Sequence, residues 1–119
     1  MGQLGLGKKP SKFNIPTVLD YIDEPATSVS AGKDHSLIMA DDGIYSMGSN
    51  EYGQLCVDTD DKNVDTPQKI DIAKKVATSF EATRFSSYIL YVDGSINACG
   101  RNNFGQLGDD STRDKFLTT

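Results

Sequence analysis

The side chains that could do chemistry in this chain of 119 residues are few and lie far apart. The single histidine, His35, follows Asp34, and neither Cys56 nor Cys99 has a base close to it in the sequence. A nucleophile needs such a base, and one histidine cannot supply a multi-histidine metal site within the chain. The sequence therefore predicts a protein that is not an enzyme, with no cofactor and no catalytic or metal-binding residues.

Two segments have the spacing of ligand loops but lack the rest of each pattern. Residues 2–7 read Gly-x-x-Gly-x-Gly, as in a phosphate loop, but without a preceding strand or a following helix. The acidic run 58–65 resembles a calcium loop, yet Lys62 occupies a ligand position and Lys69 replaces the bidentate glutamate. We interpret the first as a repeated structural segment and the second as a solvated loop that could help to dock a basic partner.

Composition and charge exclude several classes of protein. Hydrophobic residues make up 37% of the chain and charged residues 24%, and the formal net charge is −5. Proteins that follow a nucleic-acid backbone need a basic face, so we expect no direct binding of nucleic acid. No apolar run is long enough to span a membrane, and the first residues lack the apolar core of a secretory signal. We therefore expect a cytoplasmic or nuclear protein with two free thiols.

A repeat organises the chain. The tripeptide Gly-Gln-Leu begins at residues 2, 53 and 105, which gives spacings of 51 and 52 residues, and Ser95 accounts for the extra residue. Further identities follow in the same order, and the pairs are Pro16 with Pro67, Asp20 with Asp71, Ala31 with Ala82, Ser36 with Ser87, Gly48 with Gly100 and Asn50 with Asn102. Self-similarity at about 50 residues is typical of propellers and solenoids, in which each unit buries its apolar face against a neighbour.

Each repeat has the local pattern of a β-hairpin with further strands before and after it. Apolar segments flank an Asp-Gly turn, at 35–40 and 44–48 in one copy and at 86–92 and 95–100 in the next. A third strand is expected at 26–31 and 76–82. A fourth is expected near a proline, at 15–19 and 67–72, because proline suits the start of a strand or a sheet edge.

A helix over residues 70–77 is the alternative to this arrangement. Ile70, Ala73, Val76 and Ala77 could form an apolar stripe at helical spacing. The equivalent segment of the preceding copy contains Pro25, and proline inside a helix is costly. We therefore favour strands throughout.

The repeated frame resembles the regulator of chromosome condensation repeat. In this sequence it reads Val29-x-Ala31-Gly32-x-x-His35-Ser36-Leu37, then Asp42-Gly43-Ile44-Tyr45-Ser46-x-Gly48-x-Asn50-x-Tyr52-Gly53-Gln54-Leu55. The resemblance implies an all-β fold, a seven-bladed β-propeller with four antiparallel strands in each blade. The chain departs from the family where an aromatic residue commonly precedes a glycine, since Met47 and Cys99 stand there. It departs again at Cys56, where the other two copies have Gly5 and Gly108.

The repeats divide the chain into parts of a single repeat domain, 1–119. Residues 1–21 are the end of one repeat, 22–71 a complete repeat and 72–119 most of a further one. Seven such blades would need roughly 350 residues. We therefore expect a partial propeller that other blades, or copies of itself, would complete, and we favour a fragment over a short gene product or an oligomer subunit.

The candidate partner-binding residues lie in equivalent loops of two repeats. Asp34 and His35, after Lys33, match the loop that faces the GTPase in the exchange-factor members of the resembled family. Arg84 and Phe85 form the equivalent loop of the next copy, and such residues are enriched at interface hot spots. The alternatives are that His35 bonds backbone groups within its blade and that Phe85 is an ordinary core residue. Three functions remain: a protein-interaction module, part of a guanine-nucleotide exchange factor for a small GTPase, or structural blades of a larger assembly.

Overall fold

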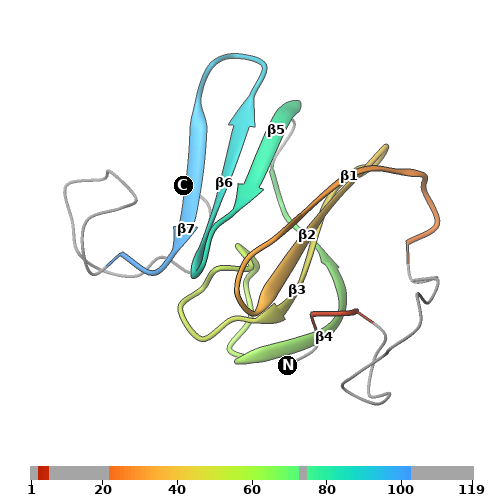
Figure 1. Ribbon diagram of the computed structural model, residues 1–119. Helices are drawn as coiled ribbons and strands as arrows, with labels where there is room; N and C mark the ends of the chain where they lie inside the picture. Colours follow the sequence, from red (N-terminus) through yellow and green to blue (C-terminus); the bar gives the residue numbers. More distant parts are fainter. Residues whose placement is uncertain (1–2, 6–21, 73–74, 103–119) are drawn as a thin grey trace.

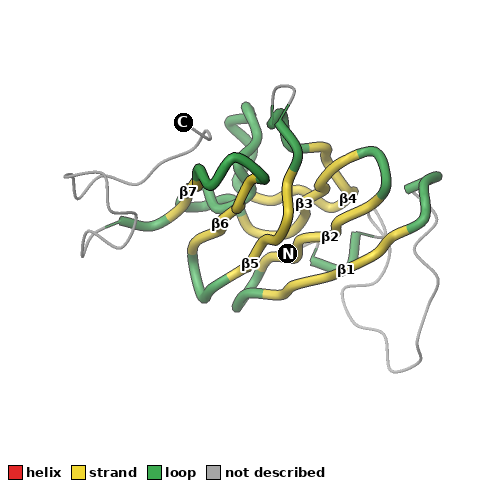
Figure 2. Tube along the Cα trace, turned by 90° about the horizontal axis from the view of Figure 1, so that it is seen from above, coloured by secondary structure: helices red, strands yellow, loops and turns green. Residues whose placement is uncertain are grey.

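Two antiparallel β-sheets make up the computed structural model, which describes residues 3–5, 22–72 and 75–102. The first sheet contains, in spatial order, β1 (Ala26–Ala31), β2 (His35–Ala40), β3 (Gly43–Ser49) and β4 (Asn63–Lys69). The second contains β5 (Ala77–Ala82), β6 (Ser86–Tyr91) and β7 (Ile96–Gly100), again in chain order (Figure 1). Within the described ranges there are strands and loops but no helix (Figure 2), and so none that could cross a membrane. The all-β expectation is confirmed.

The hairpins predicted from the Asp-Gly turns are confirmed in both sheets. In the first, β2 pairs with β3 from His35 opposite Gly48 to Ala40 opposite Gly43. In the second, β6 pairs with β7 in the equivalent register. Gly94 has φ 85°, a value that glycine reaches without steric cost and that the tight turn requires. The first strands of the two sheets are also alike, because β1 and β5 carry a register shift at equivalent positions, 26–28 and 77–79.

The fourth strand begins earlier than its proline suggests. We predicted a strand over 67–72, but β4 runs from Asn63 to Lys69, with Pro67 inside it. The pairing with β3 skips from Gln68 to Val64, so Pro67 lies in an irregular stretch where the ladder lacks a regular partner. The equivalent candidate at 15–19 lies outside the described residues. The alternative helix does not form in the described part of 70–77, where the Ile70 amide donates to the Ile44 carbonyl and Ala77 begins β5.

The hydrophobic core lies between the two sheets. Leu37 and Ile44 of the first sheet pack with Ile89 and Tyr91 of the second, and all four are almost completely buried. β5 lies against β1 and β2, so that the first strands of the two sheets are neighbours (Figures 1 and 2). Each sheet therefore depends on the other for its buried apolar face, as expected for repeat units.

The repeated Gly-Gln-Leu segment packs on the sheet that follows it in the chain. The Ser36 hydroxyl donates to the Gln3 carbonyl at 2.8 Å, and the Ser87 hydroxyl donates to the Gln54 carbonyl at 2.6 Å. A Cβ at Gly100 would lie 3.3 Å from the Gln54 Cα and 2.5 Å from the Phe85 carbonyl oxygen, which explains the glycine there. The part of this segment that is described is therefore structural, as predicted.

The two cysteines correct our expectation of free thiols. The structure joins Cys56 and Cys99 as a disulfide, with Cα atoms 5.7 Å apart. Cys56 follows Gly-Gln-Leu and Cys99 lies on β7, so the packing of that tripeptide on the second sheet brings them together. The spacing of 43 residues in the chain gave no indication of this contact.

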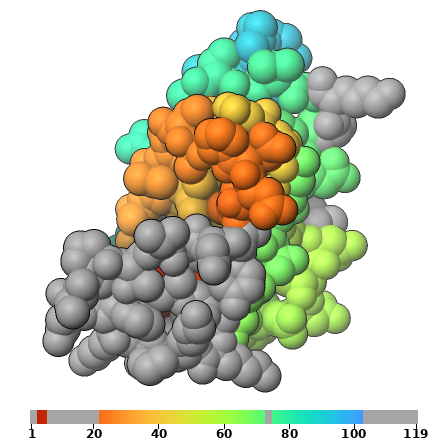
Figure 3. Space-filling view, turned by 90° about the vertical axis from the view of Figure 1, so that its right-hand side faces the viewer, coloured from red at the N-terminus to blue at the C-terminus, as the bar shows by residue number. Residues whose placement is uncertain are grey.

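Equivalent faces of the two sheets differ in how far they are covered. Leu37 and Ile44 on β2 and β3 have exposed fractions of 0% and 1%. Leu90 and Ile96, which lie opposite each other on the uncovered face of β6 and β7, are exposed by 37% and 62%. That face of the second sheet thus corresponds to the face of the first sheet that the second sheet covers. Most residues of β1 are also exposed to solvent, and they are among the orange residues in Figure 3.

Candidate functional site

Loops that follow odd-numbered strands gather at one end of the two sheets, because successive antiparallel strands reverse direction. The β1–β2 loop and the β5–β6 loop are built alike, since Gly32 donates to the His35 carbonyl and Thr83 to the Ser86 carbonyl, each at 2.9 Å. The Lys33 amide also donates to the Arg84 carbonyl at 3.2 Å. A hydrogen bond between backbone groups therefore joins the two predicted loops directly.

Five side chains from these loops form what we call the cationic aromatic cluster: Lys33, Tyr52, Arg84, Phe85 and Arg101. Phe85 is its centre. The Lys33 Nζ lies 5.5 Å from the Phe85 ring centroid, and the guanidinium carbons of Arg84 and Arg101 each lie 5.2 Å from it. Tyr52 meets Phe85 edge to face at 5.3 Å. Cation–π contacts of this kind contribute about 0.5 to 1 kcal/mol each at exposed sites.

The cluster includes three of the predicted residues and two that sequence reasoning missed. Lys33, Arg84 and Phe85 come together across the two sheets. Tyr52 and Arg101 belong to the loops that follow β3 and β7, and the Arg101 guanidinium carbon lies 5.2 Å from the Tyr52 ring centroid. The strand order would have predicted that these two residues lie near the cluster, because the loops after the first and third strands emerge at the same end of a sheet.

The cations of the cluster have no carboxylate partner among the described residues, whereas Lys69 pairs with Asp42 and Lys75 with Asp93. Lys33 and Arg84 are exposed, and Phe85 and Arg101 are partly buried. Asp34, the other acidic candidate, is partly buried beside the cluster. The cluster therefore gathers three cations around one ring, on a chain of net charge −5.

His35 lies apart from this surface and joins the two sheets. It is 1% exposed, and its Nε2 lies 3.0 Å from the Ser87 Oγ. Because the Ser87 hydroxyl donates to the Gln54 carbonyl, its oxygen accepts from Nε2, which must carry the proton. Nδ1 is then unprotonated, and it is buried with no hydrogen-bond partner among the described residues. Burial lowers the pKa of His35 from 6.5 to about 4, against opposing effects of the Ser86 backbone and of Asp34.

Gly32 allows the β1–β2 loop to lie close to the His35 ring and to the β5–β6 loop. A Cβ at that position would lie 2.4 Å from the His35 ring and 2.1 Å from the Thr83 carbonyl oxygen. Both distances are far below a normal contact, so any larger residue would force the two loops apart. The glycine therefore helps to place the loops that carry Lys33 and Arg84.

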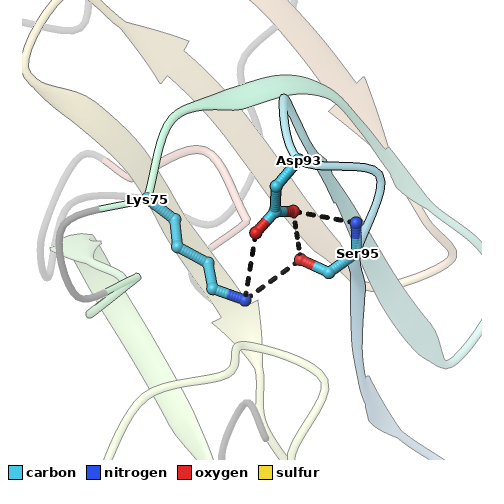
Figure 4. Close-up of polar contacts among 3 residues, drawn as sticks. All are labelled: Lys75, Asp93 and Ser95. Carbon is cyan, nitrogen blue, oxygen red and sulfur yellow. Dashed lines mark hydrogen bonds and ion pairs between the residues drawn. The ribbon is translucent and has the colours of Figure 1, made fainter.

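At the opposite end of the sheets, Lys69 and Lys75 have carboxylate partners. Asp93 accepts hydrogen bonds from the Ser95 amide at 2.8 Å and from its hydroxyl, and these bonds lower the pKa of its carboxyl group. Lys75 donates to the Ser95 Oγ at 3.0 Å and lies 3.9 Å from Asp93 (Figure 4). Ser95, the residue inserted in the second copy, thus completes the turn.

In the first copy, Tyr45 donates a hydrogen bond to Asp42, which raises the pKa of Tyr45 to about 12.

Comparisons with known proteins assign the repeat. Two models of the regulator of chromosome condensation (RCC1) repeat match, one over residues 26–54 and the other over residues 41–86. Together they include every strand from β1 to β5. The chain belongs to the RCC1 repeat family.

Relatives with RCC1 repeats are longer than this chain. It is 33% identical to the protein RCC2 homolog of Xenopus laevis, over 98% of the chain and 28% of that protein. It is 35% identical to human protein RCC2, over 87% of the chain and 21% of that protein. The chain thus spans less than a third of the length of these relatives.

Solved structures agree with the RCC1 repeat assignment in fold. Prp20p from Saccharomyces cerevisiae has a TM-score of 0.77 at 21% identity, over 99% of the chain and 31% of that protein. Human WBSCR16 has a TM-score of 0.69 at 25% identity, over 79% of the chain and 25% of that protein. The two sheets are blades of a partial β-propeller, as predicted.

Proposed function

We propose that these blades are part of a non-catalytic protein-interaction module whose cationic aromatic cluster binds an acidic surface of a partner protein. The observation that carries the proposal is the meeting of three cations around Phe85 from loops of both blades. Lys33 and Asp34 contribute the rim, whereas buried His35 would act by holding the two loops in place. We further propose a cytoplasmic or nuclear location, which suits a repeat named for chromosome condensation.

The chemistry of the cluster supports an acidic partner. Arginine and aromatic side chains are enriched at the centres of protein interfaces, where they supply most of the binding energy. Cations without a carboxylate partner raise the rate of encounter with an acidic surface and disfavour a basic one. Lys69 and Lys75, at the opposite end, already have carboxylate partners and fit this role less well.

Part of a guanine-nucleotide exchange factor for a small GTPase is the second candidate. The cluster includes the loop that the family resemblance places on the GTPase face, and the solved Prp20p structure was reported with its binding to Gsp1p and histones. Exchange would work by differential binding and needs no covalent chemistry. A role as structural blades in a larger assembly is the third candidate, supported by the uncovered face at Leu90 and Ile96.

Binding to a purified small GTPase such as Gsp1p tests the proposal, with basic core histones as a contrasting probe. We expect the variant K33A/R84A/F85A to weaken GTPase binding at least about tenfold, because hot-spot residues cost about 1 kcal/mol or more each when truncated. The matched control is K69A/K75A, which removes two cations at the other end and should bind as the wild type does. Equal loss in both variants would overturn the assignment of the site.

Release of fluorescent GDP separates the two leading candidates. The chain should accelerate release from a GTPase if it carries exchange activity, and K33A/R84A/F85A should abolish the acceleration. Binding without acceleration across a panel of small GTPases would leave the interaction module and remove the exchange factor. If neither GTPases nor acidic proteins bind, the structural role is favoured.

A further inference from the structure

Three cations of the cationic aromatic cluster share one aromatic ring. The Lys33 Nζ lies 5.5 Å from the Phe85 ring centroid, and the guanidinium carbons of Arg84 and Arg101 each lie 5.2 Å from it. No two of these groups are therefore farther apart than the sum of their distances to that point. This bound is close to the screening length of about 8 to 10 Å near physiological ionic strength, so their positive potentials add. The cluster thus attracts an anion that more than one cation can reach.

Two of the three cations are guanidinium groups that pack on aromatic rings. The Arg101 guanidinium carbon lies 5.2 Å from the Tyr52 centroid as well as from that of Phe85. A guanidinium group that packs on a ring keeps its planar fork of N–H donors, which matches the paired oxygens of a carboxylate or a phosphate. Neither arginine has a carboxylate partner among the residues that the structure describes. Their donor forks suit an anion from outside the chain.

The charge of the cluster favours a phosphate over a single carboxylate. A phosphate monoester carries a charge of about −1.5 to −2 at pH 7 and has three strong acceptor oxygens. An ionised carboxylate carries a single charge on two oxygens. The phosphate therefore matches more of the charge of Lys33, Arg84 and Arg101 and has an acceptor oxygen for each of them. Arginine clusters serve as phosphate sites in domains that bind phosphorylated segments.

Exposed carboxylates beside the cluster disfavour an extended polyanion. The β3–β4 loop that carries Tyr52 also carries Glu51, Asp58, Asp60 and Asp61, all of them exposed. A membrane surface or a nucleic-acid backbone would bring its anions near these carboxylates as well as near the cations, and the net charge of the chain is −5. A single phosphate on a protein segment avoids most of this repulsion.

We infer that the cationic aromatic cluster binds a phosphorylated serine or threonine in a segment of the partner protein, an assignment that rests on the proposed function. Arg84 and Arg101 bind the phosphate oxygens through their donor forks. Lys33, which is exposed, adds charge at the rim. Phe85 holds the three cations around one ring.

Three labelled peptides test the inference by fluorescence anisotropy with the whole chain. They share the same flanking glutamates and differ at one central residue, which is phosphoserine, glutamate or serine. We expect the phosphoserine peptide to bind at least about tenfold more tightly than the glutamate peptide, because the phosphate offers more charge and more acceptor oxygens. The serine peptide should bind most weakly.

The variant R84K/R101K keeps both positive charges but removes the planar donor forks. Its preference for the phosphoserine peptide over the glutamate peptide should fall to about threefold or less. The matched control K69A/K75A removes two cations at the other end of the sheets and should keep the preference of the wild type. All four side chains lie outside the buried core, so both variants should fold.

Equal binding of the phosphoserine and glutamate peptides, or an undiminished preference in R84K/R101K, would overturn the phosphate site and leave the acidic docking surface in place. Failure of all three peptides to bind would overturn both. Vesicles that contain phosphatidylserine provide a further arm. Tighter binding to these vesicles than to the phosphoserine peptide would assign the cluster to a membrane and contradict the inference.

Discussion

At the scale of single residues, His35 links the two blades in its neutral form. In the unfolded chain its pKa is near 6.5, whereas burial lowers the pKa to about 4 in the folded protein. Between these values the unfolded state binds more protons, so the free energy of unfolding rises with pH. The contribution of His35 is fully present above pH 6.5 and is lost as the pH falls toward 4. The shift corresponds to roughly 3 kcal/mol.

Urea unfolding at pH 7 and at pH 4.5 would measure this contribution. We expect the wild type to lose stability between the two conditions. The variant H35Q keeps a donor toward Ser87 but cannot titrate, so it should lose about 2 to 3 kcal/mol less than the wild type over the same interval. If both proteins lose the same amount, carboxylates and not His35 govern acid stability.

Residue type alone could not separate the roles of the candidate loop residues. The pair Arg84 and Phe85 was predicted from its chemistry, and the structure brings Lys33 to it. The burial of His35 follows from contact with Ser87, 52 residues away, which no local pattern indicates. The Cys56 and Cys99 contact is likewise between blades, and cysteine chemistry was interpreted from compartment alone.

At the scale of elements, hairpin chemistry was more informative than proline. The Asp-Gly turns predicted β2, β3, β6 and β7 to within a few residues because the turn fixes the register of both strands. The bounds of β4 were predicted too late in the chain, since Pro67 lies within an irregularity instead of at the start of the strand. The loop contacts of Tyr52 and Arg101 needed the strand order as well as the strands.

The uncovered face of β6 and β7 predicts self-association of the isolated chain. Leu90 and Ile96 occupy positions whose counterparts in the first blade are covered, and exposed apolar faces of this kind favour association. The variant L90S/I96S should shift the chain toward the monomer in light scattering. The control V92S removes an apolar residue that is 67% exposed after β6, where the first blade has the exposed Asp41, and should leave association unchanged. A monomeric wild type would contradict the expectation that further blades, or copies of the chain, cover this face.

At the scale of the whole molecule, the positions of the cations are more informative than the net charge. The overall charge of −5 argued against nucleic acid, but it did not reveal that Lys33, Arg84 and Arg101 gather at one end. At the other end the described lysines Lys69 and Lys75 have carboxylate partners. Net charge describes a chain, whereas docking depends on where the unpaired charges lie.

The most direct test of the proposed docking site is an NMR titration of the chain with a glutamate-rich peptide, and with a lysine-rich peptide as the control. Our account predicts that the acidic peptide shifts the signals of Lys33, Arg84 and Arg101 and that these shifts shrink as salt is added. Lys69 and Lys75 should change little. Shifts that centre on Lys69 and Lys75, or that spread evenly over all cations, would contradict the account.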